Sequence, residues 1–237
     1  MQSFFGEGIM KRILIFGDSI LKGVYYSGDE GRHRLYRERS EELRRAGFDV
    51  KNCSVMGATV STGEELLHRK LADALSGDGD RSDTAVVLEY GGNDCDYKWQ
   101  DISADPTGDF LPNTPEEAFV EGYRSCIDYV KSTGAQAYLC NLVPLDPDRY
   151  MEWISRDLSR ENILRWLGDV GRLYRWQEFY SSIAERIASL ASVPLIPVRE
   201  AFMASGAGYR NLISPDGIHP TVEGHRRIDR VLIEAMG

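Results

Sequence analysis

The sequence predicts an α/β fold in which helices cover both faces of a central parallel sheet. Short apolar runs alternate along the chain with longer amphipathic segments, which is the pattern of strands joined by covering helices. The run over residues 84–89 is almost continuously apolar, as expected of a strand buried on both faces. Of the 237 residues, 42% are apolar and 27% are charged, a composition typical of a globular protein.

Each predicted strand or helix has a local pattern that supports it. The predicted strands are residues 12–16, 48–54, 84–89, 136–142 and 193–198, and the predicted helices are residues 33–46, 62–75, 115–131 and 221–235. Gly47 is a typical stop for the first helix. Thr62 can cap the second helix, because Glu65 follows it three residues later. Pro115 suits the first turn of the third helix, and Gly134 lies just past its end.

Two segments interrupt the alternation of strands and helices. Residues 95–114 form a long polar loop after the third strand, and residues 144–180 form an aromatic-rich helical insertion after the fourth. Parallel sheets bind their ligands in loops at the carboxyl ends of the strands. The insertion is therefore a lid or acyl pocket, or alternatively a packing subcore or the interface of a homo-oligomer.

We expect a single domain over residues 1–237, because no internal repeat or linker-like stretch divides the chain. If Met10 is the natural start, residues 1–9 are a dispensable N-terminal arm. The cysteines show no metal-ligand spacing, and we expect them to be reduced and buried. They are Cys53, Cys95, Cys126 and Cys140.

Charge and hydropathy limit the partners and the compartment. Lysine and arginine number 28 against 37 aspartates and glutamates, so the net charge is −9, with no basic block. This argues against nucleic acid or an anionic membrane surface as a partner. No apolar run reaches the roughly 18 residues of a membrane span. The first apolar run is also too short for a secretory signal, so we expect a cytoplasmic protein.

Ser19, in the run F-G-D-S, is the first candidate for catalysis. It directly follows the first predicted strand, where a hydroxyl and a backbone N–H can both face a cleft. The hydroxyl would then be a nucleophile and the N–H an oxyanion donor. Gly-Asp-Ser is also a common turn, so this run by itself is weak.

His219, in the run P-D-G-I-H-P, is the histidine best placed to act as a base. Pro220 disfavours helical geometry at His219, and the flanking prolines and glycine indicate a turn. Asp216 lies three residues earlier, close enough in a turn to accept the second ring N–H and orient the imidazole. The alternative is that Asp216 caps the turn and His219 is a surface residue. The other histidines are expected in helices and are His33, His68 and His225.

Two more loops after predicted strands carry candidate oxyanion donors. Asn93 lies in the run Y-G-G-N-D, whose glycines let the backbone approach a ligand closely. Its side-chain amide can donate to an oxyanion, or alternatively cap a helix. Gly57, in the run V-M-G-A-T, offers a further backbone N–H. The carboxyl ends of parallel strands would bring all of these groups to one edge of the sheet.

Together, and in this order, the runs F-G-D-S, M-G-A, G-G-N-D and D-G-I-H-P resemble the SGNH (GDSL-type) hydrolase superfamily over residues 12–225. The resemblance implies a flavodoxin-like, three-layer α/β/α sandwich around a five-stranded parallel sheet. The first block reads G-D-S-I in place of G-D-S-L, which is a volume-conserving change.

The resemblance also implies a serine esterase or acylhydrolase that acts on a small-molecule ester and needs no metal or cofactor. Ser19 would be the nucleophile, His219 the general base and Asp216 its orienting carboxylate. The Ser19 N–H, the Gly57 N–H and the Asn93 amide would form the oxyanion hole.

Polar residues crowd the loop after Asn93 and favour short or polar esters, such as acetylated carbohydrates. Asp18, Asp94 and Trp99 are the candidate substrate-binding residues, since Trp99 could stack on a sugar ring. One alternative is a lysophospholipase-type or thioesterase-type acylhydrolase, and another is a non-catalytic carbohydrate-binding module on the same fold. A metal-dependent phosphoesterase is disfavoured, because the chain lacks the closely spaced histidine ligands it would need.

Overall fold

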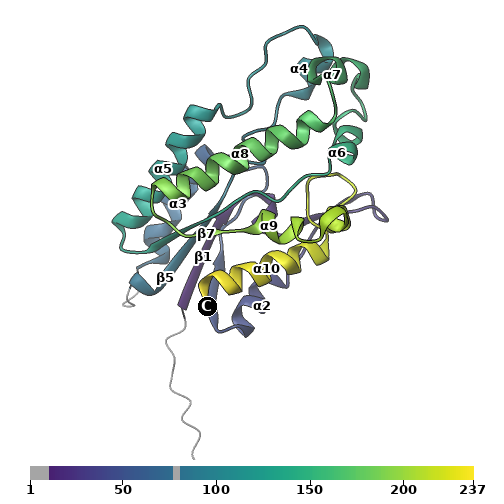
Figure 1. Ribbon diagram of the computed structural model, residues 1–237. Coiled ribbons are helices and arrows are strands. Elements are labelled where there is room, and N and C mark those ends of the chain that lie inside the picture. Colours follow the sequence, from purple (N-terminus) through teal and green to yellow (C-terminus); the bar gives the residue numbers. More distant parts are fainter. Residues whose placement is uncertain (1–10, 77–80) are drawn as a thin grey trace, which may run out of the picture.

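The computed structural model describes residues 11–76 and 81–237, and a five-stranded sheet lies at its centre (Figure 1). The strands are β1 (Lys11–Gly17), β4 (Phe48–Asn52), β5 (Thr84–Glu89), β6 (Gln136–Cys140) and β7 (Leu195–Ile196). Their order is β4-β1-β5-β6-β7 and every neighbouring pair is parallel, which is the flavodoxin-like order 2-1-3-4-5. The predicted fold class is confirmed. The expected arm, residues 1–9 with Met10, lies outside the described residues.

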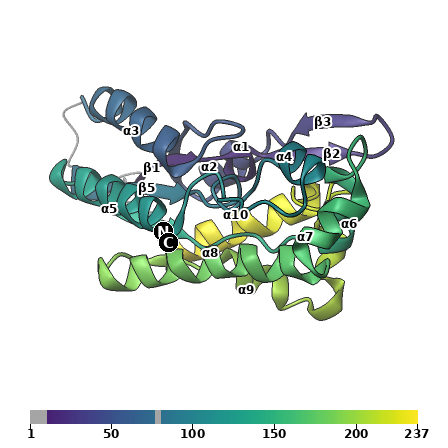
Figure 2. The same ribbon diagram turned by 90° about the horizontal axis from the view of Figure 1, so that it is seen from above.

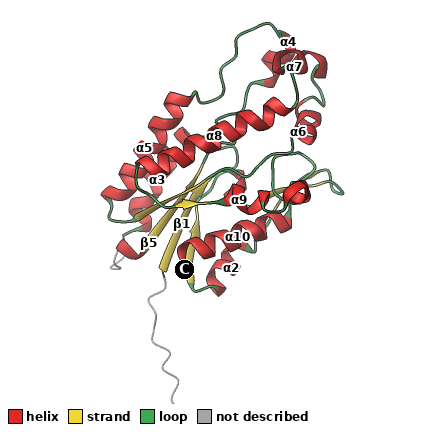
Figure 3. Ribbon diagram, viewed as in Figure 1, coloured by secondary structure: helices red, strands yellow, loops and turns green. Residues whose placement is uncertain are grey.

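Helices cover both faces of this sheet, so that the strands in Figure 3 lie between two helical layers. One layer contains α3 (Val60–Ala74), α5 (Glu116–Ser132) and α8 (Gly171–Leu190); the other contains α2 (Arg39–Arg45), α9 (Val198–Met203) and α10 (Val222–Met236). The alternation of side chains along β1 serves both layers. Leu14 and Phe16 pack toward the first layer, whereas Ile13 and Ile15 pack toward the second.

A two-stranded hairpin replaces the beginning of one predicted helix. The short helix α1 (Ser19–Lys22) is followed by the antiparallel strands β2 (Val24–Ser27) and β3 (Arg32–Leu35). The expected helix over residues 33–46 therefore begins only at α2. The charged residues of segment 33–46 suit an exposed hairpin as well as a helix surface. The charge pattern also does not indicate that Tyr26 pairs with His33 across the hairpin.

The segment expected as an insertion, residues 144–180, does not end where the sequence suggested. It contains α6 (Pro147–Ile154) and α7 (Arg160–Leu167), but its last part is the beginning of α8, which continues to Leu190 and covers the sheet. The predicted loop 95–114 contains α4 (Trp99–Ala104). Helices α4, α6 and α7 and the hairpin lie at the same end of the molecule (Figure 2).

Helix termini and short turns account for the remaining differences. Helix α3 begins at Val60, because Thr59 and not Thr62 is its N-cap; Thr62 is the reciprocal partner in the capping box. The 3₁₀ turns are Arg81–Asp83 and Gly206–Leu212. All four cysteines are buried and unpaired, as predicted. Within residues 11–76 and 81–237, no helix has the length and hydropathy needed to cross a bilayer.

Candidate active site

Ser19, His219 and Asp216 lie in one hydrogen-bonded chain. The Nε2 atom of His219 lies 2.9 Å from Ser19 Oγ, and its Nδ1 atom lies 2.6 Å from Asp216 Oδ2. Ser19 is 7% exposed, His219 is 4% exposed and Asp216 is fully buried. Because Nδ1 faces a carboxylate, the ring nitrogen that faces the serine is the one that can accept a proton.

The turn that carries Asp216 and His219 is fixed by backbone hydrogen bonds and by a glycine. The Ser214 N–H donates to the His219 carbonyl at 2.7 Å, and the N–H groups of Ile218 and His219 donate to Asp216 Oδ1. Gly217 has a φ of 82°, and a side chain there would collide with the backbone of α6. Burial raises the pKa of Asp216, but the hydrogen bonds and charge of His219 outweigh it and hold this pKa below its ordinary value.

Ser19 lies two residues after the end of β1 and is the first residue of α1. Asp18 caps this short helix, because its carboxylate accepts a hydrogen bond from the Ile20 N–H at 2.8 Å. The Ser19 N–H lies in the first turn, where helical N–H groups have no intrahelical acceptor. It is therefore available to a developing oxyanion.

Asn93 and Gly57 lie on two loops that are joined by a hydrogen bond. Asn93 lines the same pocket as Ser19, and its Nδ2 donates to the Ala58 carbonyl and to Asp18 Oδ2, each at 3.0 Å. Both amide hydrogens of Asn93 are thus engaged with protein oxygens. Gly57 is exposed with a φ of 76°, and its N–H has no hydrogen-bond partner within the described part of the chain.

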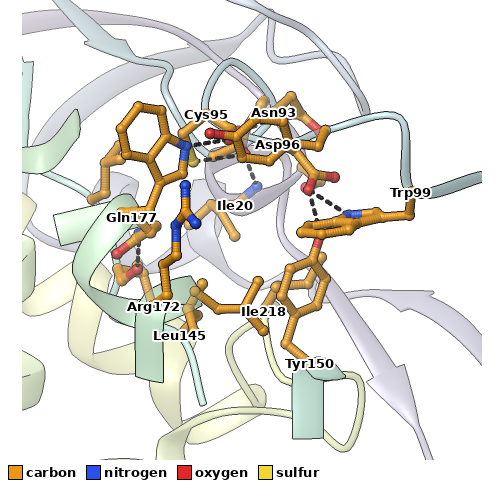
Figure 4. A pocket seen from close by; sticks show the side chains of 18 of the residues that line it. Ile20, Asn93, Cys95, Asp96, Trp99, Leu145, Tyr150, Arg172, Gln177 and Ile218 are labelled. Atoms are coloured by element: carbon orange, nitrogen blue, oxygen red, sulfur yellow. Dashed lines mark hydrogen bonds between the residues drawn. The ribbon is translucent and has the colours of Figure 1, made fainter. Parts of the chain in front are cut away.

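A pocket of about 80 Å³ is lined by Ser19 and by residues of α4, α6, α7 and α8. Figure 4 shows the side chains around it. Its apolar wall is built largely by Trp99, Leu145, Tyr150, Leu167, Leu173 and Trp176. The polar atoms of this wall are bonded to protein partners. The Trp99 Nε1 and the Tyr150 hydroxyl donate to Asp96 Oδ1 at 2.8 and 2.7 Å, and the Trp176 Nε1 donates to the Cys95 carbonyl at 2.8 Å. Ring surfaces and aliphatic groups of these residues therefore face the empty space, which Arg172 also lines (Figure 4).

The three residues expected to bind substrate differ in position. Asp18 lines the pocket beside Ser19, and Trp99 is part of its wall. Asp94 does not reach the pocket: it is fully buried, and both of its carboxylate oxygens accept from the Val60 N–H at the start of α3. Lys98, one of the polar residues in the loop after Asn93, is exposed and lies outside the pocket, whereas the next residue, Trp99, is buried at the start of α4.

A family model described as the GDSL-like Lipase/Acylhydrolase family matches residues 15–227. The chain belongs to this family. No curated protein matches the sequence.

Solved structures with the same fold cover almost the whole chain. A lipase/acylhydrolase from Enterococcus faecalis superposes with a TM-score of 0.65 at 18% identity, over 95% of this chain and 94% of the other. Est24, a carbohydrate acetylesterase from Sinorhizobium meliloti, gives 0.62 at 18% identity, over 94% and 97%. A variant of Axe2, an acetyl-xylooligosaccharide esterase from a Geobacillus species, gives 0.61 at 19% identity, over 96% and 94%. As a GDSL-like acylhydrolase, the chain is an ester-bond hydrolase.

His33 is a neighbour of the Ser19–His219–Asp216 chain that the sequence did not reveal. Its Nε2 lies 3.2 Å from Asp216 Oδ2, the same oxygen that His219 contacts. The centroids of the two imidazole rings are 5.0 Å apart, in an edge-to-face arrangement. The sequence pattern predicts a helix over residues 33–46, whereas His33 lies on strand β3 of the hairpin.

By distance alone, His33, Asp216 and His219 could also hold a metal ion, since one ligand atom of each lies within 4.8 Å of the others. The hydrogen bonds favour an acid–base function instead. His219 uses one ring nitrogen for Asp216 and the other for Ser19, so a metal on this cluster would compete with both contacts.

Proposed function

We propose that this GDSL-like hydrolase cleaves carboxylic esters through an acyl-enzyme on Ser19. The observation that carries the proposal is the hydrogen-bonded chain from Ser19 Oγ through His219 to the buried Asp216 carboxylate. Such a chain can raise the nucleophilicity of a serine without a metal or cofactor. The free, buried cysteines fit a reducing compartment and support the cytoplasmic location that the sequence predicts.

In the first half-reaction, Ser19 Oγ attacks the acyl carbonyl carbon and His219 Nε2 takes the hydroxyl proton. Asp216 stabilises the imidazolium that forms. The tetrahedral oxyanion accepts hydrogen bonds from the N–H groups of Ser19 and Gly57 and from the Asn93 amide, which gives up its bond to Asp18 for this purpose. The C–O bond to the alcohol then breaks, and His219 returns the proton to the leaving oxygen.

In the second half-reaction, a water molecule replaces the alcohol. His219 removes a proton from this water as the water oxygen attacks the acyl carbon, and the same donors hold the second oxyanion. The bond to Ser19 Oγ breaks, the serine recovers its proton from His219, and the carboxylic acid leaves.

Replacement of the nucleophile tests the mechanism. We expect Ser19→Ala to lower kcat on p-nitrophenyl acetate by at least about 10⁴-fold, because no acyl-enzyme can form. Asn93→Ala, which removes one oxyanion donor, should retain activity that is lower by about 10²–10³-fold. The readouts are initial rates and covalent labelling by a fluorophosphonate, with the labelled residue located by peptide mass spectrometry.

Ser54→Ala is the matched control for this experiment. Ser54 is 7% exposed like Ser19 and follows the neighbouring strand, but its hydroxyl has no partner within the described residues. This variant should keep wild-type rates. Full activity of Ser19→Ala would contradict the proposed mechanism, and inertness of the wild type toward esters and fluorophosphonate would favour the non-catalytic alternative.

The apolar pocket favours an acyl group larger than the acetyl group expected from the sequence. Two of the similar structures are acetylesterases by their descriptions, which supports acetyl esters as the first substrates to test. However, a sugar site needs free hydrogen-bonding groups, and those of Trp99, Tyr150 and Trp176 are bonded to protein atoms. The wall therefore supports the acylhydrolase alternative, with the acyl chain lying against it.

A series of p-nitrophenyl esters separates the two substrate classes. If the chain binds the acyl group in this pocket, kcat/KM should rise by at least about tenfold from acetate to hexanoate, because each buried methylene contributes about 0.8 kcal/mol. Leu173→Phe, which narrows the pocket, should abolish this rise. Leu190→Phe, at the exposed end of the same helix, should not change it. A steep fall in kcat/KM beyond acetate in the wild type would support acetyl esters instead.

A further inference from the structure

We propose that His33 is a positioning residue for the candidate active site, and that it acts through the Asp216 carboxylate. This inference rests on the proposed function, because it concerns the base His219. The structure shows two imidazole rings, from His33 and His219, at a single carboxylate oxygen, Asp216 Oδ2, at 3.2 and 2.6 Å.

The hairpin holds His33 in this position from two sides. The backbone N–H of Tyr26 donates to the Ser214 hydroxyl at 3.3 Å, so the hairpin is tied to the turn that carries Asp216. The His33 ring packs edge to face against Tyr26 and Trp153, with centroids 5.3 and 5.7 Å away. Asp216 is the only protein partner of the ring nitrogens within the described part of the chain.

The charges around His33 leave Asp216 as its counter-ion. From the segment after α6, the Arg156 guanidinium lies 3.3 Å above the Trp153 ring and 5.6 Å from that of Tyr26. On the hairpin itself, Arg32 and Arg34 flank His33, and both pair with Glu30.

Two further titratable groups interact with His219. Asp18 interacts electrostatically with His219, as does the buried His225. Within residues 11–76 and 81–237, the Asp216 carboxylate is the one negative group that contacts both rings.

A donor from His33 changes the protonation of His219. Asp216 Oδ2 can neutralise the charge of one imidazolium well. A hydrogen bond or a positive charge from His33 therefore reduces the stabilisation that this oxygen gives to a protonated His219. The proton on His219 is then held less strongly, and the ring becomes available as a base at lower pH. His33 thus extends the activity toward acidic pH without touching the substrate.

The test compares His33→Phe, His33→Gln and the wild type by kcat/KM as a function of pH. The phenylalanine variant keeps a ring but loses the donor, so the midpoint of its acid limb should move to higher pH by about half a unit. KM should stay unchanged. The glutamine variant keeps a neutral donor and should have a midpoint between the other two. His68→Gln changes an exposed histidine on α3 and should reproduce the wild-type profile.

A second readout does not depend on turnover. NMR titration of the histidine rings should show that the His219 signals titrate at higher pH in His33→Phe than in the wild type. Unchanged midpoints in both measurements would overturn the proposal, and so would equal losses of kcat in both variants with an unshifted profile, which indicate a structural effect. If the wild type hydrolyses no ester but the NMR midpoints shift, the proposed function fails and the coupling of the two rings stands.

Discussion

Glu89 is a buried carboxyl group beside the serine loop, with little hydrogen-bond support. Its Oε2 atom has no partner within the described residues. Burial raises the pKa of Glu89 well above its ordinary value, and the neighbouring carboxyl of Asp18 raises it further. Burial also raises the pKa of Asp18 to about 6, against the hydrogen bonds from Ile20, Glu89 and Asn93 and the charge of His219. Burial and the neighbouring carboxyl thus both favour the protonated form of Glu89.

This assignment predicts a pH-dependent gain of stability in Glu89→Gln. A carboxyl whose pKa is raised on folding stabilises the protein at low pH, and the contribution is lost as pH rises through the raised pKa. Glutamine cannot ionise. The free energy of unfolding of the variant should therefore increase relative to that of the wild type by about 1.4 kcal/mol for each pH unit above the ordinary pKa of glutamate. Urea unfolding between pH 4.5 and 8 measures the difference. A pH-independent difference, like that expected of the exposed Glu117→Gln, would contradict the assignment.

At the scale of secondary structure, the start of α3 explains why Asp94 is buried. The Val60 N–H donates to both oxygens of the Asp94 carboxylate, at 3.0 and 3.2 Å, and Thr59 with Thr62 satisfies further N–H groups of the first turn. The sequence placed Asp94 next to the candidate oxyanion donor, but its side chain points to a helix on the far side of the loop. The local sequence around Asp94 is compatible with both roles, so it does not distinguish a helix-capping carboxylate from a ligand-binding one.

The helix-capping role of Asp94 gives a separate prediction. Asp94→Ala should lower the free energy of unfolding by about 1–3 kcal/mol, because the Val60 N–H is left buried without an acceptor. KM should not change, since Asp94 does not line the pocket. Chemical denaturation and ester kinetics measure the two quantities, with Asp101→Ala on the exposed side of α4 as the control. An increase in KM at unchanged stability would instead restore the substrate-binding role.

At the scale of the whole molecule, the strand order explains how distant residues meet. Strand β1 pairs with β4 on one side and with β5 on the other, so the loops of Gly57, Ser19 and Asn93 leave three adjacent strands at the same edge. His219 is 200 residues from Ser19 and reaches it because the chain leaves the parallel strand β7 at this edge and passes through α9 and the 3₁₀ turn Gly206–Leu212 before α10 begins. The cluster built by α4, α6 and α7 closes the space above the edge and forms the apolar pocket.

Comparison of the predictions with the structure separates local from tertiary information. All five strands of the central sheet and the approximate positions of helices α3, α5 and α10 could be predicted. Apolar periodicity and caps such as Pro115 and Thr221 are local features of the sequence. Ser19 and His219 could be paired from their motifs. The hairpin of His33 and the continuation of α8 to Leu190 could not be predicted, since strand pairing and helix packing depend on residues far away in the chain.

The sequence by itself determined the layered α/β fold, the family and the residues able to form a nucleophile, a base and an orienting acid, because motif order and periodicity are written along the chain. Only the tertiary structure decided that His33 shares the Asp216 oxygen, that Asp94 caps α3, and that Trp99 belongs to an apolar wall. The physical reason is that burial and hydrogen-bond partners arise between segments. A side chain's neighbours in sequence do not specify which atoms it meets after folding.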